Sequence, residues 1–158
     1  MSKKTRSRSP IGVFDSGVGG LTVLSALAAL LPNEKFIYVG DTARVPYGSK
    51  SPEAVRRFSL EIARFLMKSR IKMLVVACNT SSALAMADLR RALPIPVLGV
   101  IEPGARAALA ATRSGRVGVI GTAATVKSGA YEAALRHLKA SLKVFSAACP
   151  LCVPLVEE

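Results

Sequence analysis

One cysteine, Cys78, stands where an apolar, β-branched run changes into an alanine-rich helical pattern (residues 73–85, MLVVACNTSSALA). A thiol at the amino-terminal end of a helix lies near unpaired backbone N–H groups and the positive end of the helix dipole, and both favour the thiolate. We therefore expect the pKa of Cys78 to lie below its usual value of about 8.5. The thiolate would act as a nucleophile or a base. The alternative is a small apolar side chain that ends a buried strand.

Short polar side chains next to this cysteine favour the functional interpretation. Asn79 and Thr80 follow Cys78 directly, and both could hold the carboxylate of a substrate.

A second polar cluster begins at Asp15 (residues 15–20, DSGVGG), where the glycines allow a tight turn and close approach of a ligand. The run lacks both the third-glycine spacing of a dinucleotide site and the Lys-Ser/Thr of a P-loop. An acidic residue facing a helix N-terminus would also repel a phosphate. Asp15 could instead hold an ammonium group or relay a proton, and a helix-capping role is the alternative.

Two further segments contain groups that could bind a ligand or a metal. In the loop of residues 41–48, the Tyr47 hydroxyl and the Gly48 N–H could cover a ligand. Cys149 and Cys152 form a CxxC pair, which could be a thiol redox pair or half of a zinc site. With no second CxxC and with His137 as the one histidine, a four-ligand zinc site cannot be assembled. We expect no metal, and we interpret the two cysteines as small apolar residues near a strand end in preference to a redox pair.

Regular alternation of short apolar runs and helical patterns predicts the fold class. Strands are expected at residues 11–14, 36–40, 73–77, 96–100, 117–121 and 142–146, and helices at 21–31, 52–69, 82–93, 104–112 and 129–140. Pro32 ends the first helix, and Ser51 caps the second. This order is typical of an α/β protein built from βαβ units with a largely parallel sheet. Functional groups gather at the carboxyl ends of such strands, so residues 15–20, 78–81 and 121–125 are expected to meet.

An internal similarity suggests two related halves. Residues 11–16 (IGVFDS) and 117–122 (VGVIGT) share a pattern and a position before a helix. A counterpart of Cys78 would then lie about 62 residues after Thr122, near position 184, beyond the 158 residues of the chain. We expect a disordered basic tail at residues 1–9, a first α/β domain at 10–97 and an incomplete second α/β domain at 98–158, the two domains being pseudo-symmetric.

Composition and charge narrow the class of protein. The 158 residues are 51% hydrophobic and 20% charged, which is typical of a globular protein. No apolar run reaches the roughly 18 residues of a membrane span, and no signal peptide is evident, so we expect a cytoplasmic protein without membrane contact. A net charge of +12 attracts polyanions or small anions. The scattered Lys and Arg residues and the few aromatic residues argue against nucleic-acid binding as the main role.

Several motifs together resemble the glutamate racemase family of the cofactor-independent aspartate/glutamate racemase superfamily. They occur in family order from about residue 11 to the end of the chain: FDSGVGGLTVL (14–24), VPYG (45–48), ACNTSSA (77–83), VIEPG (100–104), GTAAT (121–125) and ACPLCVPLVEE (148–158).

The resemblance implies interconversion of L- and D-glutamate without pyridoxal phosphate, metal or another cofactor, which supplies D-glutamate for peptidoglycan synthesis. It also implies two α/β domains that face each other across a cleft. Racemisation needs two acid–base groups on opposite sides of Cα, and preorganised hydrogen bonds must stabilise the carbanion. By resemblance, Cys78 is the first catalytic cysteine, and Asp15 assists proton transfer or binds the substrate ammonium. The remaining predicted substrate-binding residues are Ser16, Tyr47, Gly48, Asn79, Thr80, Thr122 and Thr125, with Glu157 in a segment that adds a polar group in relatives.

The chain also departs from the family pattern. The second catalytic cysteine of the family lies in a Gly-Cys-Thr-His-Tyr-Pro type motif, and no such stretch occurs in the 158 residues. Cys149 matches a family position that is not the second base, and Cys152 replaces an aromatic residue. We therefore expect this chain to racemise weakly if at all, to expose apolar surface and to be poorly stable or to self-associate, with a homodimer as one open alternative. Other readings are an aspartate racemase or related decarboxylase, and an inactive remnant that serves as a basic binding module.

Overall fold

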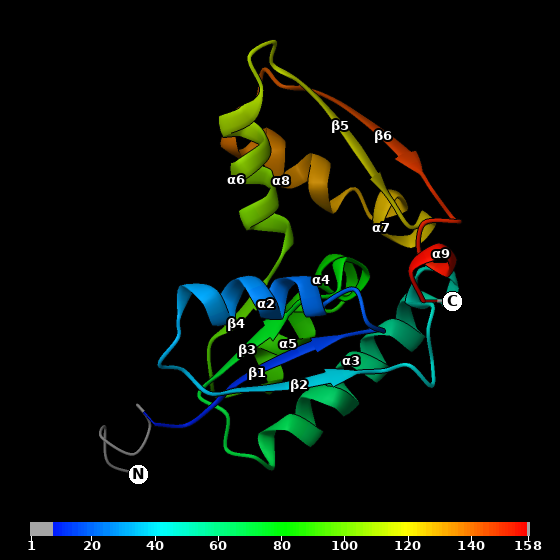
Figure 1. Cartoon of the computed structure of the whole chain (residues 1–158). Coiled ribbons are helices and arrows are strands. Elements are labelled where there is room, and N and C mark those ends of the chain that lie inside the picture. The colour runs from blue at the N-terminus through cyan, green and yellow to red at the C-terminus, as the bar shows by residue number, and fades with distance from the viewer. Residues whose placement is uncertain (1–7, 158) are drawn as a thin grey trace.

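The computed structural model describes residues 8–157, and within them six parallel strands form two separate sheets (Figure 1). The larger sheet has the order β2-β1-β3-β4, and its strands are β1 (Ile11–Asp15), β2 (Phe36–Gly40), β3 (Met73–Val76) and β4 (Val97–Gly99). The smaller sheet pairs β5 (Arg116–Gly121) with β6 (Lys143–Ala148). The predicted α/β fold class with parallel βαβ units is confirmed.

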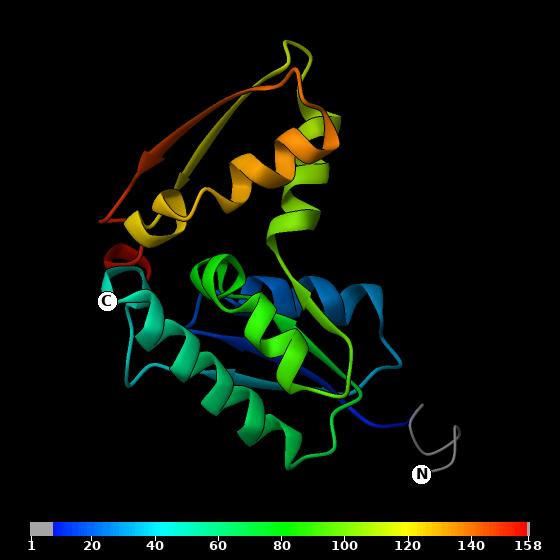
Figure 2. The same cartoon turned by 180° about the vertical axis from the view of Figure 1, so that it is seen from behind.

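Helices cover both faces of the larger sheet (Figures 1 and 2). On one face lies α2 (Leu21–Leu30), and on the other lie α3 (Pro52–Met67), α4 (Asn79–Leu84) and α5 (Met86–Ala92). Helices α6 (Ile101–Ala111) and α8 (Ala130–Leu138) pack on one face of the smaller sheet. Three short elements complete the fold: the 3₁₀ turn η1 (Tyr47–Ser49), α7 (Ala123–Lys127) and α9 (Pro154–Glu157).

The core of the larger sheet explains why its two central strands are fixed in place. All five residues of β1 are buried, because helices cover both of its faces. On one side Phe14 packs among buried residues of α3 and α5, such as Leu66 and Leu89. Burial of each such side chain contributes about 1.5–3 kcal/mol. The carboxyl ends of β1 and β3, which carry Asp15 and Cys78, are therefore held side by side.

Several helix boundaries differ from the prediction, and local hydrogen bonds explain part of the difference. Ser51 does cap α3, because its hydroxyl accepts the Ala54 N–H at 3.2 Å. The helix expected at 82–93 instead begins at Asn79, and it is divided into α4 and α5 at Ala85. Helix α6 begins at Ile101, three residues early. The sequence did not predict η1, α7 or α9, because each of them is too short to show a helical period.

The smaller sheet leaves apolar side chains uncovered on its second face. Ile120 on β5 is 74% exposed and Phe145 on β6 is 54% exposed. Leu155 on α9 is also exposed, at 82%. Exposure of apolar surface, expected from the sequence, is confirmed.

The predicted domain limits stay a prediction. Residues 1–7 of the proposed tail lie outside the described residues, and the boundary between residues 97 and 98 falls inside β4. None of the helices in residues 8–157 combines the length and the apolar character that a bilayer crossing requires.

Candidate functional site

A cavity of about 390 Å³ lies at the carboxyl ends of β1, β3 and β5, between the two sheets. The three polar clusters that were expected to meet all contribute to it. Among the predicted site residues, those that line the cavity are Asp15, Ser16, Cys78, Asn79, Thr80, Thr122, Thr125 and Glu157. Side chains that were not predicted, including Tyr131, also line it.

Cys78 is the cap of α4, and its side chain is only 3% exposed. The sulfur accepts the Ser81 N–H at 3.4 Å, and the thiol donates to the Ser16 hydroxyl oxygen at 3.6 Å. Once the thiol is ionised, the Ser16 hydroxyl can turn and donate to the sulfur. Both contacts therefore favour the thiolate, and the one from the Ser81 N–H is the contact that the sequence predicts for a helix N-terminus.

The predicted lowering of the Cys78 pKa is nevertheless wrong. Burial raises the pKa of the Cys78 thiol, the nearby Asp15 carboxylate raises it further, and the hydrogen bonds from Ser81 and Ser16 lower it by less. The prediction considered the helix terminus but neither the depth of the site nor a carboxylate from the neighbouring strand. Burial and the Asp15 carboxylate thus favour the neutral thiol over the thiolate in the resting site.

Asp15 is 7% exposed, and the turn that follows β1 holds its carboxylate. Its Oδ2 accepts the Gly20 N–H at 2.9 Å and the Gly17 N–H at 3.3 Å. The Tyr38 hydroxyl fixes the same turn by donating to the Gly17 carbonyl at 2.7 Å. Asp15 thus has the capping contacts of the alternative interpretation, and it also lines the cavity beside Cys78.

Three threonine hydroxyls connect the two sides of the cavity. The Thr80 Oγ1 on α4 lies 3.0 Å from the Thr122 Oγ1 and 3.2 Å from the Thr125 Oγ1. Thr122 and Thr125 lie 2.9 Å apart, and Thr122 caps α7 by accepting the Thr125 N–H. Because hydroxyl hydrogens rotate, this cluster can turn donors toward a carboxylate.

Asn79 is held from α8 by a residue that was not predicted. The Tyr131 hydroxyl donates to Asn79 Oδ1 at 2.6 Å, which leaves the Asn79 amide N–H groups available to another acceptor. Tyr131 lies within an ordinary amphipathic helix, so no local motif marks it in the sequence.

Tyr47 and Gly48 do not line the cavity in this structure. The Tyr47 side chain is 1% exposed, and its hydroxyl donates to Asp41, whose carboxylate also pairs with Arg44 at 2.7 Å. Gly48 packs directly against Thr122. Substrate binding by Tyr47 and Gly48 therefore stays a prediction.

Glu157 brings the last helix against the first turn of the chain. Its carboxylate oxygens accept the Val18 N–H at 2.9 and 3.2 Å. The approach is close enough that a side chain at Gly17 would overlap the Glu157 carboxylate. α9 thus forms one wall of the cavity, together with Cys152.

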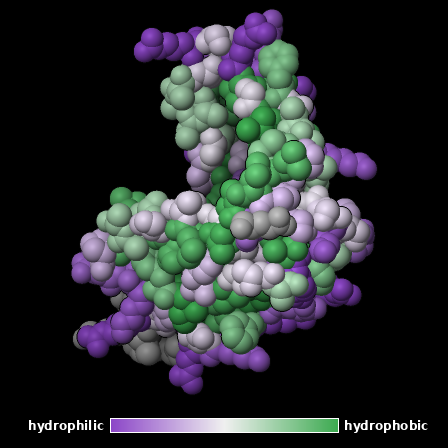
Figure 3. Space-filling model, turned by 45° about the vertical axis from the view of Figure 1, so that its right-hand side comes forward, coloured by the Kyte–Doolittle hydropathy of each residue, from purple (hydrophilic) through white to green (hydrophobic). Residues whose placement is uncertain are grey.

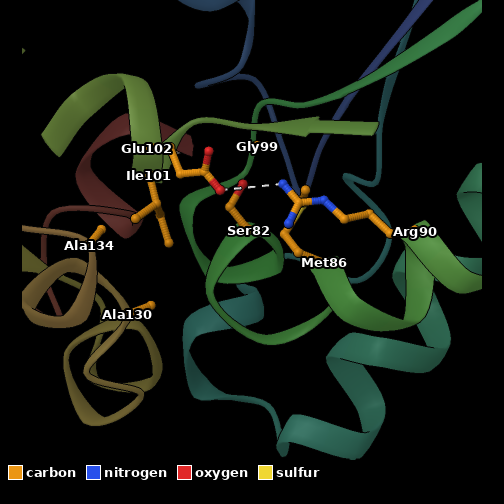
Figure 4. A pocket seen from close by; sticks show the side chains of 8 residues that line it. All are labelled: Ser82, Met86, Arg90, Gly99, Ile101, Glu102, Ala130 and Ala134. Atoms are coloured by element: carbon orange, nitrogen blue, oxygen red, sulfur yellow. Dashed lines mark hydrogen bonds and ion pairs between the residues drawn. The ribbon is translucent and has the colours of Figure 1, made fainter. Parts of the chain in front are cut away.

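A second hollow lies where β4, α5, α6 and α8 meet, and Figure 4 shows its lining. Its volume is about 220 Å³, and an ion pair of 3.4 Å between Arg90 and Glu102 spans it. The Ser82 hydroxyl already donates its hydrogen bond to the Val76 carbonyl at 3.0 Å. None of the lining side chains is a thiol, so this hollow is less suited to proton transfer. Across residues 8–157, no group of three or more His, Cys, Asp or Glu side chains could hold a metal ion.

Comparison with known proteins gives a consistent result. A family model described as Asp/Glu/Hydantoin racemase matches residues 11–155. The glutamate racemase of Geobacter metallireducens is 63% identical over 148 residues, which are 94% of this chain and 55% of that relative. A crystal structure of a Bacillus anthracis glutamate racemase isoform superposes with a TM-score of 0.91 at 53% identity, covering 94% of this chain and 56% of the other. The crystal structure of the Francisella tularensis glutamate racemase in complex with D-glutamate superposes with a TM-score of 0.87 at 41% identity, covering 94% of this chain and 56% of the other. The chain spans little more than half the length of the relatives that it matches.

Proposed function

Because the chain belongs to the Asp/Glu/Hydantoin racemase family, we propose that the protein interconverts L- and D-glutamate by proton transfer at Cα. One observation carries this proposal: a buried thiol, Cys78, lies beside a carboxylate and a hydroxyl in a polar cavity. The names of the relatives support glutamate as the substrate, and one of them is described in complex with D-glutamate. The product would serve peptidoglycan synthesis, and a cytoplasmic location stays a prediction.

Cys78 would carry the proton on one side of Cα. Starting as a neutral thiol, it donates its proton to the carbanion, and the Ser81 N–H and Ser16 hydroxyl stabilise the thiolate that remains. In the opposite direction the thiolate removes the Cα proton. We assign only this side of the reaction to the described residues. The group that acts on the opposite face is left unassigned, and the sequence motif that carries the second cysteine in the family does not occur in this chain.

The polar lining suits an amino acid with two carboxylates. Asp15 offers a negative charge for the substrate ammonium, and the threonine cluster and the Asn79 amide offer donors for carboxylates. The net charge of +12 would also attract an anionic substrate at long range.

Substrate binding can be tested by isothermal titration calorimetry with glutamate and aspartate enantiomers. We expect glutamate to bind more tightly than aspartate, and Asn79→Ala to weaken glutamate binding about 10- to 100-fold, because a hydrogen bond to a charged group contributes about 1.5–3 kcal/mol. The matched control Cys149→Ser changes a residue outside the cavity lining and should bind as the wild type does.

The other outcomes favour the alternatives. Equal or tighter binding of aspartate would favour an aspartate racemase. Failure of both amino acids to bind, with salt-sensitive binding of nucleic acid that Cys78→Ala leaves unchanged, would favour a basic binding module.

A further inference from the structure

The CxxC pair, Cys149 and Cys152, occupies the turn between β6 and α9. The Cys149 N–H donates to the Gly121 carbonyl at 2.8 Å, so this residue is anchored to the end of β5. The Cys152 N–H donates to the Cys149 carbonyl at 3.3 Å and closes a turn over residues 149–152. Figure 1 shows this connection between the end of β6 and α9.

The two cysteines occupy the first and last positions of this turn. The neighbouring Cys149 side chain, together with some desolvation, raises the pKa of the Cys152 thiol. Both cysteines are free, and Cys152 is exposed while Cys149 is half-buried. A four-residue turn places its first and last Cα atoms within about 7 Å, and disulfides join Cα atoms about 4.4–6.8 Å apart. A bond between these sulfurs therefore needs little movement of the backbone.

Cys152 lines the same cavity as Cys78, but the two cysteines differ in exposure. Cys152 lines the cavity, and three residues of the following segment, Val153, Val156 and Glu157, line it too. Cys78 is only 3% exposed, whereas Cys152 is open to a reagent in solvent.

We propose that Cys149 and Cys152 form a redox-active dithiol on the cavity wall, which small disulfides of the glutathione type oxidise to an internal disulfide. The thiol of Cys152 loses its proton, and its sulfur attacks the small disulfide, so that a mixed disulfide forms and one small thiolate leaves. Cys149, after losing its own proton, then attacks the Cys152 sulfur, and the second small thiolate leaves. The protein gives up two electrons and two protons, and the small disulfide becomes two thiols.

The bond would tie the end of β6 to the start of α9. Because α9 carries Glu157, whose carboxylate binds the Val18 N–H, oxidation would restrict the segment that closes one side of the cavity. This site does not depend on the racemase activity, since the residues that make it are not those assigned to proton transfer.

A redox titration tests the site directly. The protein is equilibrated with mixtures of glutathione and glutathione disulfide, trapped with iodoacetamide and examined by mass spectrometry with peptide mapping. We expect the wild type to lose the mass of two hydrogen atoms, to carry no glutathione and to show a Cys149–Cys152 cross-link. Cys78→Ala keeps both cysteines and should titrate as the wild type does.

Variants that lack one of the two cysteines should behave differently from the wild type. Cys149→Ser and Cys152→Ser should each form only a mixed disulfide with glutathione, at ratios at which the wild type is internally cross-linked. A wild type that stays reduced or merely glutathionylated at those ratios would overturn the proposal. So would a cross-link that contains Cys78 or joins two chains.

Discussion

At the residue scale, the chemistry of Cys78 depends on two opposing influences. The Ser81 N–H and the Ser16 hydroxyl favour the thiolate, whereas burial and the Asp15 carboxylate favour the thiol, and the second pair prevails. A group that returns a proton to a carbanion must hold that proton first, so a raised pKa suits the donor in one direction of racemisation. The same environment must then tolerate the thiolate, which is the role of the two hydrogen bonds.

This balance predicts opposite effects for two substitutions. Asp15→Asn keeps an oxygen that can accept the Gly17 and Gly20 N–H groups but removes the charge, so the pKa of Cys78 should fall. Ser16→Ala removes a hydrogen bond to the thiolate, so the pKa of Cys78 should rise further. At a pH below both pKa values, iodoacetamide should alkylate Cys78 several-fold faster in the first variant and more slowly in the second. Both substitutions are made in a chain that also carries Cys149→Ser and Cys152→Ser, so that only Cys78 can be alkylated. If both substitutions changed the alkylation rate in the same direction, the opposite effects assigned to Asp15 and Ser16 would be contradicted.

At the element scale, the strands were easier to predict than the helices. Each apolar run predicted as a strand became one within two residues at either end. For the central strands β1 and β3 the reason is burial on both faces, which needs a continuous apolar sequence. The grouping of Asp15, Cys78 and Thr122 could also be predicted, because parallel strands bring their carboxyl ends to one edge of a sheet. The elements η1, α7 and α9 could not be predicted, because three to five residues carry no periodic signal. Tyr131 was missed because only the tertiary fold brings α8 to Asn79.

The contact between η1 and α7 can be tested through two glycines. A methyl group at Gly48 would overlap the side chain of Thr122, whereas a methyl group at Gly118 on β5 meets nothing within 4 Å. Gly48→Ala should therefore cost about 1–3 kcal/mol of unfolding free energy, as overpacking usually does. Gly118→Ala is the matched control and should stay within about 0.5 kcal/mol of the wild type. Urea unfolding measures both, and equal stability of the two variants would show that Gly48 does not pack as described.

At the scale of the whole molecule, the arrangement of the two sheets accounts for the cavity and for the exposed apolar face of the smaller sheet. Two sheets meet at the carboxyl ends of their strands, and within residues 8–157 helices cover only one face of the smaller sheet. On the face drawn in Figure 3, apolar residues lie together toward the middle and hydrophilic residues lie mostly along the edges. Exposed side chains on several elements account for apolar surface of this kind: Leu21, Leu30, Phe65, Leu98, Ile120, Phe145, Leu151, Leu155 and Val156.

Such a surface predicts self-association that depends on concentration. Phe145 lies on the uncovered face of the smaller sheet, so Phe145→Thr should weaken association about tenfold or more, since burial of a large side chain contributes about 1.5–3 kcal/mol. Ser69→Asn alters an exposed polar side chain just after α3, outside this set, and should change association little. Sedimentation velocity over a concentration series measures both. A wild type that remains monomeric throughout, with a cooperative melting transition, would contradict the expectation.

The assignment of Cys78 as the proton carrier can be tested most directly by exchange at the Cα of glutamate. The chain is incubated in D₂O with L-glutamate and, separately, with D-glutamate, while NMR follows deuterium incorporation and circular dichroism follows inversion. Because Cys78 lies on one side of Cα, we expect slow incorporation of deuterium into one of the two enantiomers, with little or no inversion, at least tenfold slower in Cys78→Ala and unchanged in Cys149→Ser. Exchange that persists in Cys78→Ala, or no exchange with either enantiomer, would contradict the assignment of Cys78 as the group that moves the Cα proton.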